Sequence, residues 1–463
     1  MTDLLREPAL YIDGDWVPGT AEDCEVENPA TEQTTGVVAQ ASPHEVEGAL
    51  EAAHRAFASW SATPVAERAD ALRRLHDVIA ERAETFAELI NREQGSPPPL
   101  ARKLHVDVPL SVIAQTAAAV EEFAFRSRIG NSVIIREPVG VVAAITPWNL
   151  PLHQIIVKVV PALAAGCTVV LKPAALTPLT AFELARAFDA AGFPAGVFNL
   201  VAGSGRDVGE QLTKSPLVDH VSFTGSTAVG RRIAAMAAET LKGVTLELGG
   251  KSASVVLSDV SDERLATAVK VTVANCYLNG GQTCTALSRL IVPANRLPQV
   301  EQLAAAAAAK FQPGTRLGPL ISAGQRKEVE SFLTPGKVVS SPLELPDRGY
   351  YVTPTVYSDV DPDSRLAQEE IFGPVLSIMT AESDDHAIEL ANNSIYGLGG
   401  ALWTDDTDRA TEWSARIRTG QVDVNGAPFN PRAPFGGYKQ SGIGREIGDY
   451  GIADVLEIKA VQL

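Results

Sequence analysis

The sequence predicts an α/β fold built on mostly parallel sheets. Two observations carry this prediction. Short apolar runs rich in β-branched residues alternate with helical patterns, and the chain of 463 residues is long enough for two or three sizeable cores. The strand candidates are apolar throughout, as expected where helices cover both faces of a parallel sheet.

Each element follows from its own pattern. Helical periodicity covers four long stretches, Glu45–Ser59, Val65–Gln94, Leu179–Ala191 and Ser261–Val273. The five strand candidates are Gly140–Ile145, Thr168–Leu171, His220–Phe223, Ala253–Leu257 and Arg289–Val292. The most apolar long run, Ile155 to Leu171, is too short for a comfortable membrane span and contains a lysine and a proline. We interpret it as a buried helix that leads into a buried strand.

Two further strand-like segments interrupt the α/β rhythm, Arg128–Arg136 and the C-terminal Val455–Leu463. Unpaired strand edges seek partners, so these segments could form an oligomerisation arm. They could equally pair with each other inside one subunit, and the sequence leaves both alternatives open.

Composition excludes several classes of function. A net charge of −17 argues against non-specific nucleic-acid binding, which needs basic surface. The four cysteines, Cys24, Cys167, Cys276 and Cys284, show no spacing typical of a metal site or a disulfide framework. A reducing, cytoplasmic location therefore fits best. No basic segment followed by an apolar run marks a signal peptide at the N-terminus.

Cys284 is the first candidate for a catalytic residue. Small and polar residues flank it in Asn279-Gly280-Gly281-Gln282-Thr283-Cys284-Thr285, a setting typical of an accessible thiol. Glu247 lies in a glycine-rich stretch upstream, Leu246-Glu247-Leu248-Gly249-Gly250-Lys251. A cysteine and a carboxylate together favour covalent catalysis with a built-in base. Cys167 and Cys276 are interpreted as packing residues.

Five more motifs accompany this pair along the chain. They are Ile145-Thr146-Pro147-Trp148-Asn149-Leu150-Pro151, Leu171-Lys172-Pro173-Ala174, Phe223-Thr224-Gly225-Ser226-Thr227-Ala228-Val229-Gly230, Glu369-Glu370-Ile371-Phe372-Gly373-Pro374-Val375 and Pro434-Phe435-Gly436-Gly437-Tyr438-Lys439-Gln440-Ser441-Gly442-Ile443-Gly444-Arg445-Glu446. In this order and combination the chain resembles the aldehyde dehydrogenase superfamily, from Tyr11-Ile12-Asp13-Gly14 to near the C-terminus.

The resemblance implies a three-part architecture and a known reaction. It implies a Rossmann-like NAD(P)-binding domain over 1–123 and 138–248, an α/β catalytic domain over 249–447, and a small β oligomerisation arm over 124–137 and 448–463. The reaction implied is oxidation of an aldehyde to its acid. The resemblance also implies that identical subunits associate as a homodimer or a homotetramer. The tetramer is the less secure expectation of the two, because several loops of this chain are short.

The catalytic roles implied by the resemblance fall on four residues. Cys284 attacks the aldehyde to give a thiohemiacetal and then a thioester. The Asn149 amide and the Cys284 backbone N–H stabilise the oxyanion. Glu247 activates the water that hydrolyses the thioester, which opposes a CoA-acylating reaction. Lys158 either assists a proton relay beside Glu247 or bonds nearby carbonyl groups, and Asn149 could alternatively cap the following helix.

The resemblance also implies where NAD or NADP binds. Ser226 would lie near the pyrophosphate at a helix terminus, Lys172 and Gly203 near the adenosine, and Glu370 and Phe372 near the nicotinamide ribose and ring. The remaining coenzyme contacts expected are Thr146, Trp148, Gly225 and Gly249. NAD-preferring relatives often carry a glutamate where this chain has Ala175. We therefore expect an enzyme that accepts NAD but discriminates weakly against NADP.

The substrate pocket is expected to be apolar and uncharged, with one exception. Its expected lining is Leu150, Gln154, Val157, Thr283, Thr285, Phe429 and Phe435. This polarity favours an uncharged aliphatic or aromatic aldehyde. The exception is Arg432, which could bind the distal carboxylate of a semialdehyde or point to solvent. A catalytically idle NAD-binding protein of the same fold is a further alternative.

Overall fold

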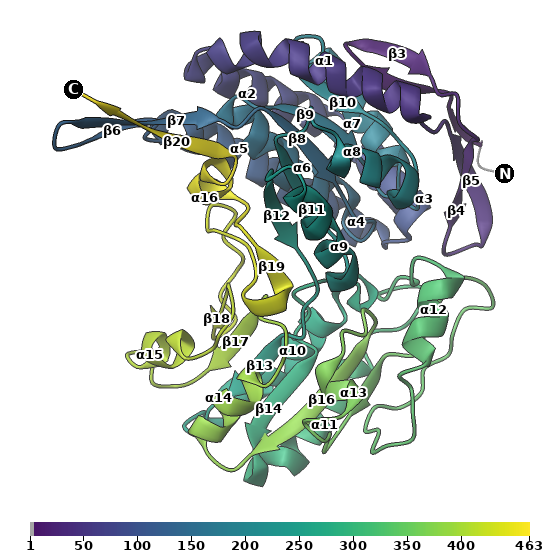
Figure 1. Cartoon of the computed structure of the whole chain (residues 1–463). Helices are drawn as coiled ribbons and strands as arrows, with labels where there is room; N and C mark the ends of the chain where they lie inside the picture. The colour runs from purple at the N-terminus through teal and green to yellow at the C-terminus, as the bar shows by residue number, and fades with distance from the viewer. Residues whose placement is uncertain (1–3) are drawn as a thin grey trace.

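The computed structural model describes residues 4–463, which form an upper and a lower sheet-centred half and a projecting arm (Figure 1). Helices cover the two large sheets, and most neighbouring strands within them run parallel. The predicted α/β class with parallel sheets is therefore confirmed. The chain reaches the lower half after β12 and returns to the upper half before its C-terminus.

The upper half is built on an eight-stranded sheet of order β19-β12-β11-β8-β9-β10-β2-β3. Its five central strands are parallel and almost wholly buried, and its edges are antiparallel. In sheet order the strands are Gly442–Ile443, Gly243–Glu247, His220–Thr224, Val141–Ile145, Thr168–Lys172, Phe198–Leu200, Ala9–Ile12 and Asp15–Pro18.

Seven long helices pack around this sheet. They are α1 (Pro43–Ala62), α2 (Val65–Glu81), α3 (Ala83–Gln94), α5 (Val108–Glu122), α6 (Pro151–Ala165), α7 (Leu179–Ala190) and α9 (Thr227–Ala238). As predicted, the apolar run after Ile155 is a buried helix, α6, followed by the buried strand β9. Such buried apolar surface is the main source of stability in a core of this kind.

The predicted helix over Val65–Gln94 is wrong in one respect, because the structure divides it into α2 and α3. The backbone at Arg82 leaves the helical region, with φ −103° and ψ 15°, and the Arg82 guanidinium bonds Glu183 at 3.2 Å. No glycine or proline marks this break, so the apolar periodicity of the sequence runs through it.

The lower half is built on a six-stranded parallel sheet of order β15-β16-β14-β13-β17-β18. In that order the strands are Thr355–Tyr357, Val375–Ala381, Arg289–Pro293, Ala253–Val256, Gly400–Trp403 and Asp423–Val424. One apolar cluster includes α10 (Asp262–Cys276) and α11 (Leu297–Ala308), and a second includes α14 (Asp384–Asn392). The two clusters cover opposite faces, as is usual for a parallel sheet.

Shorter elements complete the two halves. The N-terminal region adds a small sheet of β1 (Leu5–Glu7), β5 (Gln33–Val38) and β4 (Cys24–Asn28), which the sequence did not predict. The shorter helices are α4 (Pro98–Arg102), η1 (Lys103–Asp107), η2 (Gly205–Gly209), α8 (Glu210–Lys214), η3 (Leu278–Gly281), η4 (Ala294–Arg296), α12 (Ala323–Glu330), α13 (Arg365–Gln368), α15 (Ala410–Ala415), η5 (Lys439–Ser441) and α16 (Gly448–Ala453). Among residues 4–463, no helix is both long enough and apolar enough to cross a membrane.

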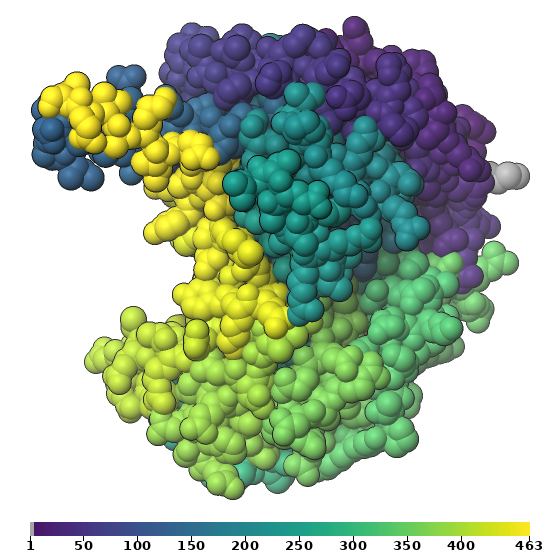
Figure 2. Space-filling view, viewed as in Figure 1, coloured from purple at the N-terminus to yellow at the C-terminus, as the bar shows by residue number. Residues whose placement is uncertain are grey.

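The arm is a three-stranded antiparallel sheet of β6 (Arg126–Ile129), β7 (Ser132–Pro138) and β20 (Leu456–Gln462). The two strand-like segments of the sequence therefore pair with each other within one chain. The arm extends away from the body, and the C-terminus lies at its end (Figure 1). Figure 2 shows a hollow between the arm and the lower half. Ile129 and Ile458 remain 69% and 70% exposed, so apolar surface is left on the arm.

Candidate active site

Cys284 follows a tight turn that glycine makes possible. Asn279, Gly280 and Gly281 have φ values of 54°, 69° and 76°, all in the left-handed region. A Cβ atom on Gly281 would lie 2.2 Å from the Gly373 carbonyl oxygen. A side chain at that position would therefore displace the backbone. The turn brings the cysteine loop against the loop that contains Phe372.

The turn is held by buried side-chain amides. Gln282 accepts a hydrogen bond from the Ile321 N–H at 2.8 Å and donates to the carbonyls of Asn279 and Pro319, at 3.0 and 3.2 Å. Asn279 donates to the carbonyl of Asn149 at 2.7 Å, and its Oδ1 accepts from Gln94. These bonds fix the cysteine loop relative to the segment that contains Asn149.

Asn149 lies where the chain leaves β8 and enters α6. Its side-chain Nδ2 donates to the carbonyl of Gln282 at 3.1 Å. Leu150 is the N-cap residue of α6, and the helix has no side-chain cap. The alternative role of Asn149 as a helix cap is therefore wrong. The amide instead lies beside the cysteine loop, buried in a cavity wall that also includes Cys284.

Cys284 differs from the other cysteines of the lower half in its access to solvent. It is a free thiol with intermediate exposure and borders two cavities. Cys276, by contrast, is fully buried and donates to the Val375 carbonyl, consistent with its predicted packing role. Burial, followed by the nearby carboxylates of Glu247 and Glu370, raises the pKa of Cys284 to about 12. Without added positive charge, the thiol form dominates at neutral pH.

Glu247 ends β12 and is buried next to this thiol. Among the described residues, neither carboxylate oxygen has a hydrogen-bond partner. Burial, and then the charge of Glu446, raises the pKa of Glu247 well above its ordinary value. Gly436 leaves the necessary space, because a Cβ atom there would lie 2.7 Å from Glu247 Oε1. An unpaired buried carboxyl group of this kind is typical of a catalytic acid or base.

Lys158 forms a buried ion pair that the sequence analysis missed. Its Nζ lies 2.5 Å from Glu446 Oε1 and donates to Ser222 Oγ at 3.3 Å. Among the described residues it bonds no carbonyl group, so that alternative is wrong. Its positive charge opposes burial and Glu446, which both raise the pKa of Glu247. Glu446 and Lys158 are 288 residues apart, and nothing in their local sequences indicates the pairing.

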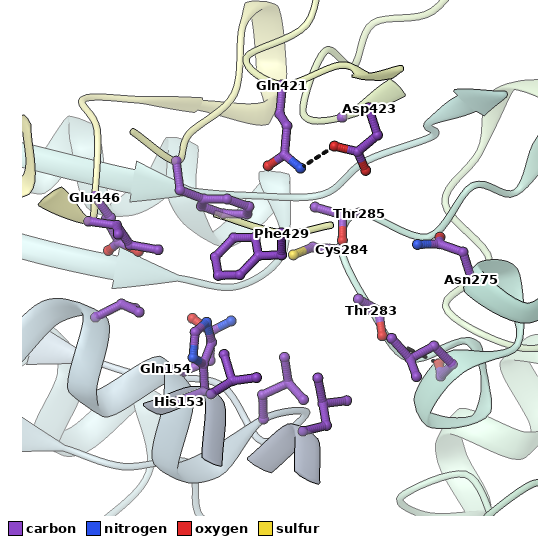
Figure 3. A pocket seen from close by; sticks show the side chains of 18 of the residues that line it. His153, Gln154, Asn275, Thr283, Cys284, Thr285, Gln421, Asp423, Phe429 and Glu446 are labelled. Carbon is purple, nitrogen blue, oxygen red and sulfur yellow. Dashed lines mark hydrogen bonds between the residues drawn. The ribbon is translucent and has the colours of Figure 1, made fainter. Parts of the chain in front are cut away.

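The first cavity at Cys284 has an open volume of about 1050 Å³, part of which is open solvent. Seven predicted pocket residues line it: Leu150, Gln154, Val157, Thr283, Thr285, Phe429 and Phe435. In Figure 3, Cys284 and Phe429 lie near the centre, with His153 and Gln154 on one side and Gln421 and Asp423 on the other. Leu104 and Val108, from the segment that begins α5, add apolar surface that the sequence did not reveal.

Two expectations about this cavity require correction. Arg432 does not line it; the side chain is exposed and pairs with Glu122 at 2.5 Å. The lining is also not free of charge, since Asp423 and Glu446 both contribute to it. Asp423 was missed because a two-residue strand carries no periodicity that shows which way its side chains point.

The second cavity at Cys284, of about 810 Å³, contains much of the predicted coenzyme set. The predicted residues that line it are Trp148, Gly225, Ser226, Gly249, Glu370 and Phe372. Ser226 is the N-cap of the 12-residue helix α9, and Trp148 contacts the edge of Phe372, with ring centroids 5.3 Å apart. Gln325 and Glu328 of α12 also line the cavity and were not predicted.

The other predicted coenzyme residues gather near the carboxyl end of β9, outside the lining of that cavity. Lys172 is buried and donates to the Gly203 carbonyl at 3.1 Å, and burial lowers its pKa to about 8. The Thr146 N–H donates to the Lys172 carbonyl at 3.1 Å. Ala175 lies in the half-exposed turn that follows. The carboxyl ends of parallel strands commonly bind nucleotides in this way.

The second cavity has features that fit a dinucleotide. The helix N-terminus at Ser226 favours an anion such as a pyrophosphate. The Glu370 carboxylate can accept hydrogen bonds from ribose hydroxyl groups, and Gly249 gives it room, since a Cβ there would lie 2.3 Å from Glu370 Oε2. The buried Thr224 hydroxyl in the cavity wall also has no partner among the described residues, which leaves it available to a ligand.

Comparison with known proteins gives one consistent result. A profile of the aldehyde dehydrogenase family matches residues 16–461. The chain is 44% identical to a 3-succinoylsemialdehyde-pyridine dehydrogenase of Pseudomonas sp, over 98% of both chains. It is 40% identical to a geranial dehydrogenase of Castellaniella defragrans, again over 98% of both.

Solved structures agree with this result. A Pseudomonas syringae aldehyde dehydrogenase C mutant complexed with NAD⁺ and octanal has a TM-score of 0.95 and 42% identity, covering 98% of this chain and 96% of that one. A Mycobacterium tuberculosis aldehyde dehydrogenase complexed with NAD⁺ has a TM-score of 0.96 and 39% identity, covering 100% and 99%.

Proposed function

Because this chain belongs to the aldehyde dehydrogenase family, we propose that it oxidises an uncharged aliphatic or aromatic aldehyde to the acid with NAD or NADP. The observation that carries the proposal is the position of Cys284, the one residue of 4–463 that lines both the first cavity, proposed for the aldehyde, and the second cavity, proposed for the coenzyme. An aldehyde bound in the first and a coenzyme bound in the second would meet at its sulfur.

Cys284 is the proposed nucleophile, and Asn149 the group that stabilises its adduct. Addition of the sulfur to the carbonyl carbon gives a thiohemiacetal, whose oxygen carries the developing negative charge. One N–H of the Asn149 amide bonds Gln282, which leaves the other to donate to this oxygen together with the Cys284 backbone N–H. Removal of one such donor typically costs roughly 3–4 kcal/mol of transition-state stabilisation.

Activation of the thiol requires a nearby base. A pKa of about 12 keeps the Cys284 proton in place at neutral pH, so the attacking sulfur must transfer that proton as it reacts. Glu247 is the proposed acceptor, because it is buried next to the thiol and neither of its carboxylate oxygens has a hydrogen-bond partner among the described residues. The same carboxylate would later take a proton from the water that hydrolyses the thioester.

The Lys158–Glu446 ion pair influences the proton affinity of Glu247. Burial is the main cause of the raised pKa of Glu247; Glu446 raises it further, whereas Lys158 lowers it. The pair therefore adjusts the proton affinity of the base, and it would offer a buried path for a proton that leaves Glu247.

The residues that would hold the coenzyme are the second cavity and the group near β9. Ser226 and the N-terminus of α9 would bind the pyrophosphate, Lys172 the adenosine side, and Glu370 the nicotinamide ribose. When bound, the coenzyme supplies the acceptor for the two electrons that leave the aldehyde. Ala175 has no carboxylate to repel a 2′-phosphate, so weak discrimination between NAD and NADP is part of the proposal.

The proposed division of labour follows the sheets, except that β19, which lies within 249–447, is an edge strand of the upper sheet. Residues 1–123 with 138–248 would bind the coenzyme, and 249–447 would supply the nucleophile. The arm, 124–137 with 448–463, would join subunits into a homodimer or a homotetramer through its exposed edge and apolar side chains.

The substrate class rests on the cavity and on related enzymes. Most of the cavity wall is apolar, Arg432 is directed to Glu122, and no lysine or arginine of residues 4–463 lines the cavity. The described lining therefore offers no cation to the distal carboxylate of a semialdehyde. The relatives named for geranial or solved with octanal act on or bind uncharged aldehydes.

A panel of aldehydes followed by NADH fluorescence tests the proposal. Octanal, benzaldehyde and succinic semialdehyde, each with and without coenzyme A, separate aldehyde class from acyl acceptor. We expect oxidation of the first two with free acid as product, and loss of activity by about a thousandfold or more in Cys284→Ser, as for other covalent nucleophiles. Cys276→Ser is the matched control. Coenzyme binding without oxidation of any aldehyde would refute the proposal.

A further inference from the structure

The aldehyde cavity contains a carboxylate that the proposed reaction does not use. Asp423 begins the two-residue edge strand β18, opposite Ala401 of β17, and lines the same cavity as Cys284. It is half-buried, and burial raises its pKa above the ordinary value. Loss of water around a carboxylate must be offset by another hydrogen-bond donor.

The structure supplies only part of that compensation. Gln421 Nε2 donates to Asp423 Oδ1 at 2.9 Å. Within residues 4–463, Asp423 forms no ion pair, and no lysine or arginine lines the cavity. Figure 3 shows Gln421 and Asp423 together on one wall, near Thr285 and across the cavity from His153. The second carboxylate oxygen is therefore left without a donor from the described chain.

The other acidic residue in the wall is different. Glu446 is paired with Lys158 and also bonds Ser222, so its charge is neutralised within the protein. The excess negative charge of the aldehyde cavity thus resides at Asp423, and its free oxygen is the acceptor available to a substrate.

From this geometry, and resting on the proposed aldehyde oxidation, we propose that Asp423 selects aldehydes whose body carries a hydrogen-bond donor. The donor is a hydroxyl group, which leaves the aldehyde uncharged, or a protonated nitrogen, which would extend the proposed substrate range to cationic aldehydes. Asp423 accepts its hydrogen bond while Cys284 holds the carbonyl end. A substrate with a carboxylate at the same position is disfavoured by charge repulsion. Sites built to bond a polar group reject analogues that leave the site unpaired.

Matched para- and meta-substituted benzaldehydes test this selection, because their substituents differ in chemistry but not in size. Hydroxymethyl is compared with ethyl. Dimethylaminomethyl, which is protonated at neutral pH, is compared with isobutyl and with carboxymethyl. The hydroxymethyl and dimethylaminomethyl comparisons show whether the preferred donor is a hydroxyl group or a protonated nitrogen. The measurement is kcat/KM for each aldehyde at saturating NAD.

In the wild-type enzyme we expect each donor-bearing aldehyde to exceed its apolar match in at least one ring position by about tenfold, as for a hydrogen bond to a charged acceptor. Carboxymethyl should be the poorest substrate. In Asp423→Asn and Asp423→Val the donor-to-apolar ratio should fall towards one, and the carboxymethyl aldehyde should improve relative to isobutyl. Asp408→Asn, which removes an exposed carboxylate, should leave all ratios unchanged.

The outcomes separate this inference from the function on which it rests. Oxidation of the apolar aldehydes with equal ratios in wild type and both Asp423 variants would overturn the role of Asp423 and leave the dehydrogenase proposal intact. A wild-type preference for the carboxymethyl aldehyde would overturn it even if neither variant folds. Failure to oxidise any benzaldehyde or alkanal would refute the dehydrogenase proposal itself, and the inference with it.

Discussion

Glu247 and Cys284 are two neighbouring acids whose pKa values burial moves in the same direction. The thiol is held protonated, and the carboxyl is ionised only above its ordinary range. A proton can therefore pass from the Cys284 thiol to the Glu247 carboxylate while the negative charge stays within this pair of neighbouring groups. The consequence is that activity should depend on pH through Glu247 rather than through a stable thiolate.

The first prediction concerns that dependence. With Glu247 as the base for hydrolysis, kcat should rise as pH increases through its raised pKa, because only the ionised form accepts a proton. Glu247→Gln should lose this rise and lower kcat by about a hundredfold or more. Steady-state pH profiles and the first-turnover burst of NADH measure both effects. The exposed Glu239→Gln should keep the wild-type profile; an unchanged profile in Glu247→Gln would remove Glu247 from the mechanism.

The second prediction concerns the coenzyme. The wild-type preference for NAD over NADP should stay below about a hundredfold in kcat/KM, or ~2.7 kcal/mol, because Ala175 cannot repel a 2′-phosphate. Ala175→Glu should raise this preference by about tenfold or more, since a carboxylate accepts ribose hydroxyl bonds and repels phosphate. Leu176→Glu adds the same charge one residue along on an exposed side chain and should change the ratio less. Equal effects of the two substitutions would contradict the assignment.

At the scale of elements, a buried polar side chain of one helix can cap another helix that has no side-chain cap of its own. Helix α7 has Pro178 at its N-cap and no side-chain cap of its own residues. Glu93, at the end of α3, accepts hydrogen bonds from the N–H groups of Leu179 and Thr180, at 2.6 and 3.1 Å, and from the Thr180 hydroxyl. One helix thereby satisfies the free N–H groups at the start of another.

The third prediction follows from burial of that cap. Burial raises the pKa of Glu93 from 4.5 to about 7. A carboxyl whose pKa is raised on folding contributes stability that is present below pH 4.5 and lost as pH rises through 7. The stability advantage of wild type over Glu93→Gln should therefore shrink by on the order of 3 kcal/mol across that window. Urea unfolding at several pH values measures it.

The controls for this prediction lie on the same helix. Glu88→Gln removes an exposed carboxylate from α3 and should show no such window. A difference between wild type and Glu93→Gln that is constant from pH 4.5 to pH 8 would show that Glu93 ionises normally in the folded protein.

At the scale of the whole molecule, the arm projects from the body (Figure 1). Its three strands pair with one another, but the outer edges of β6 and β20 are left without partner strands among the described residues, and two isoleucines are exposed. Exposed apolar side chains on a projecting sheet are typical of a protein interface.

The fourth prediction tests this surface. Ile129→Glu combined with Ile458→Glu should shift the protein to a smaller oligomer, because both substitutions place charge on the apolar surface of the arm. Analytical ultracentrifugation measures the mass. Leu241→Glu, at the most exposed large apolar residue of the body, should leave the mass unchanged. If the double variant keeps the wild-type mass, the arm is not the interface.

The sequence predicted the fold class and the residues that lie in glycine-rich motifs, because those signals are local. Apolar runs identified the buried strands β8, β9, β11, β13 and β14, and the glycines marked the Cys284 turn. The break at Arg82 was missed because the helical periodicity continues through it.

What the sequence could not predict are pairings between distant segments. Glu446 stands in a motif without an assigned role, and only folding brings it to Lys158. Asp423 and Leu104 reach the aldehyde cavity from opposite halves of the chain. Arg432, in the loop before Phe435, was expected either to bind a distal carboxylate in that cavity or to point to solvent, and its exposed side chain pairs with Glu122. Side-chain direction in an irregular loop is set by tertiary contacts, not by sequence spacing.

The two cavities share a single lining residue, Cys284, and this separation has a consequence for the order of events. Each ligand would occupy its own cavity, so neither ligand needs to leave before the other enters. In the proposed reaction, the spent coenzyme would be free to leave while the acyl group is still attached to the sulfur, and the acid would leave through the other cavity. Among the described residues, Cys284 is thus the only one common to both cavities. Movement of one ligand through its cavity need not wait for movement of the other ligand.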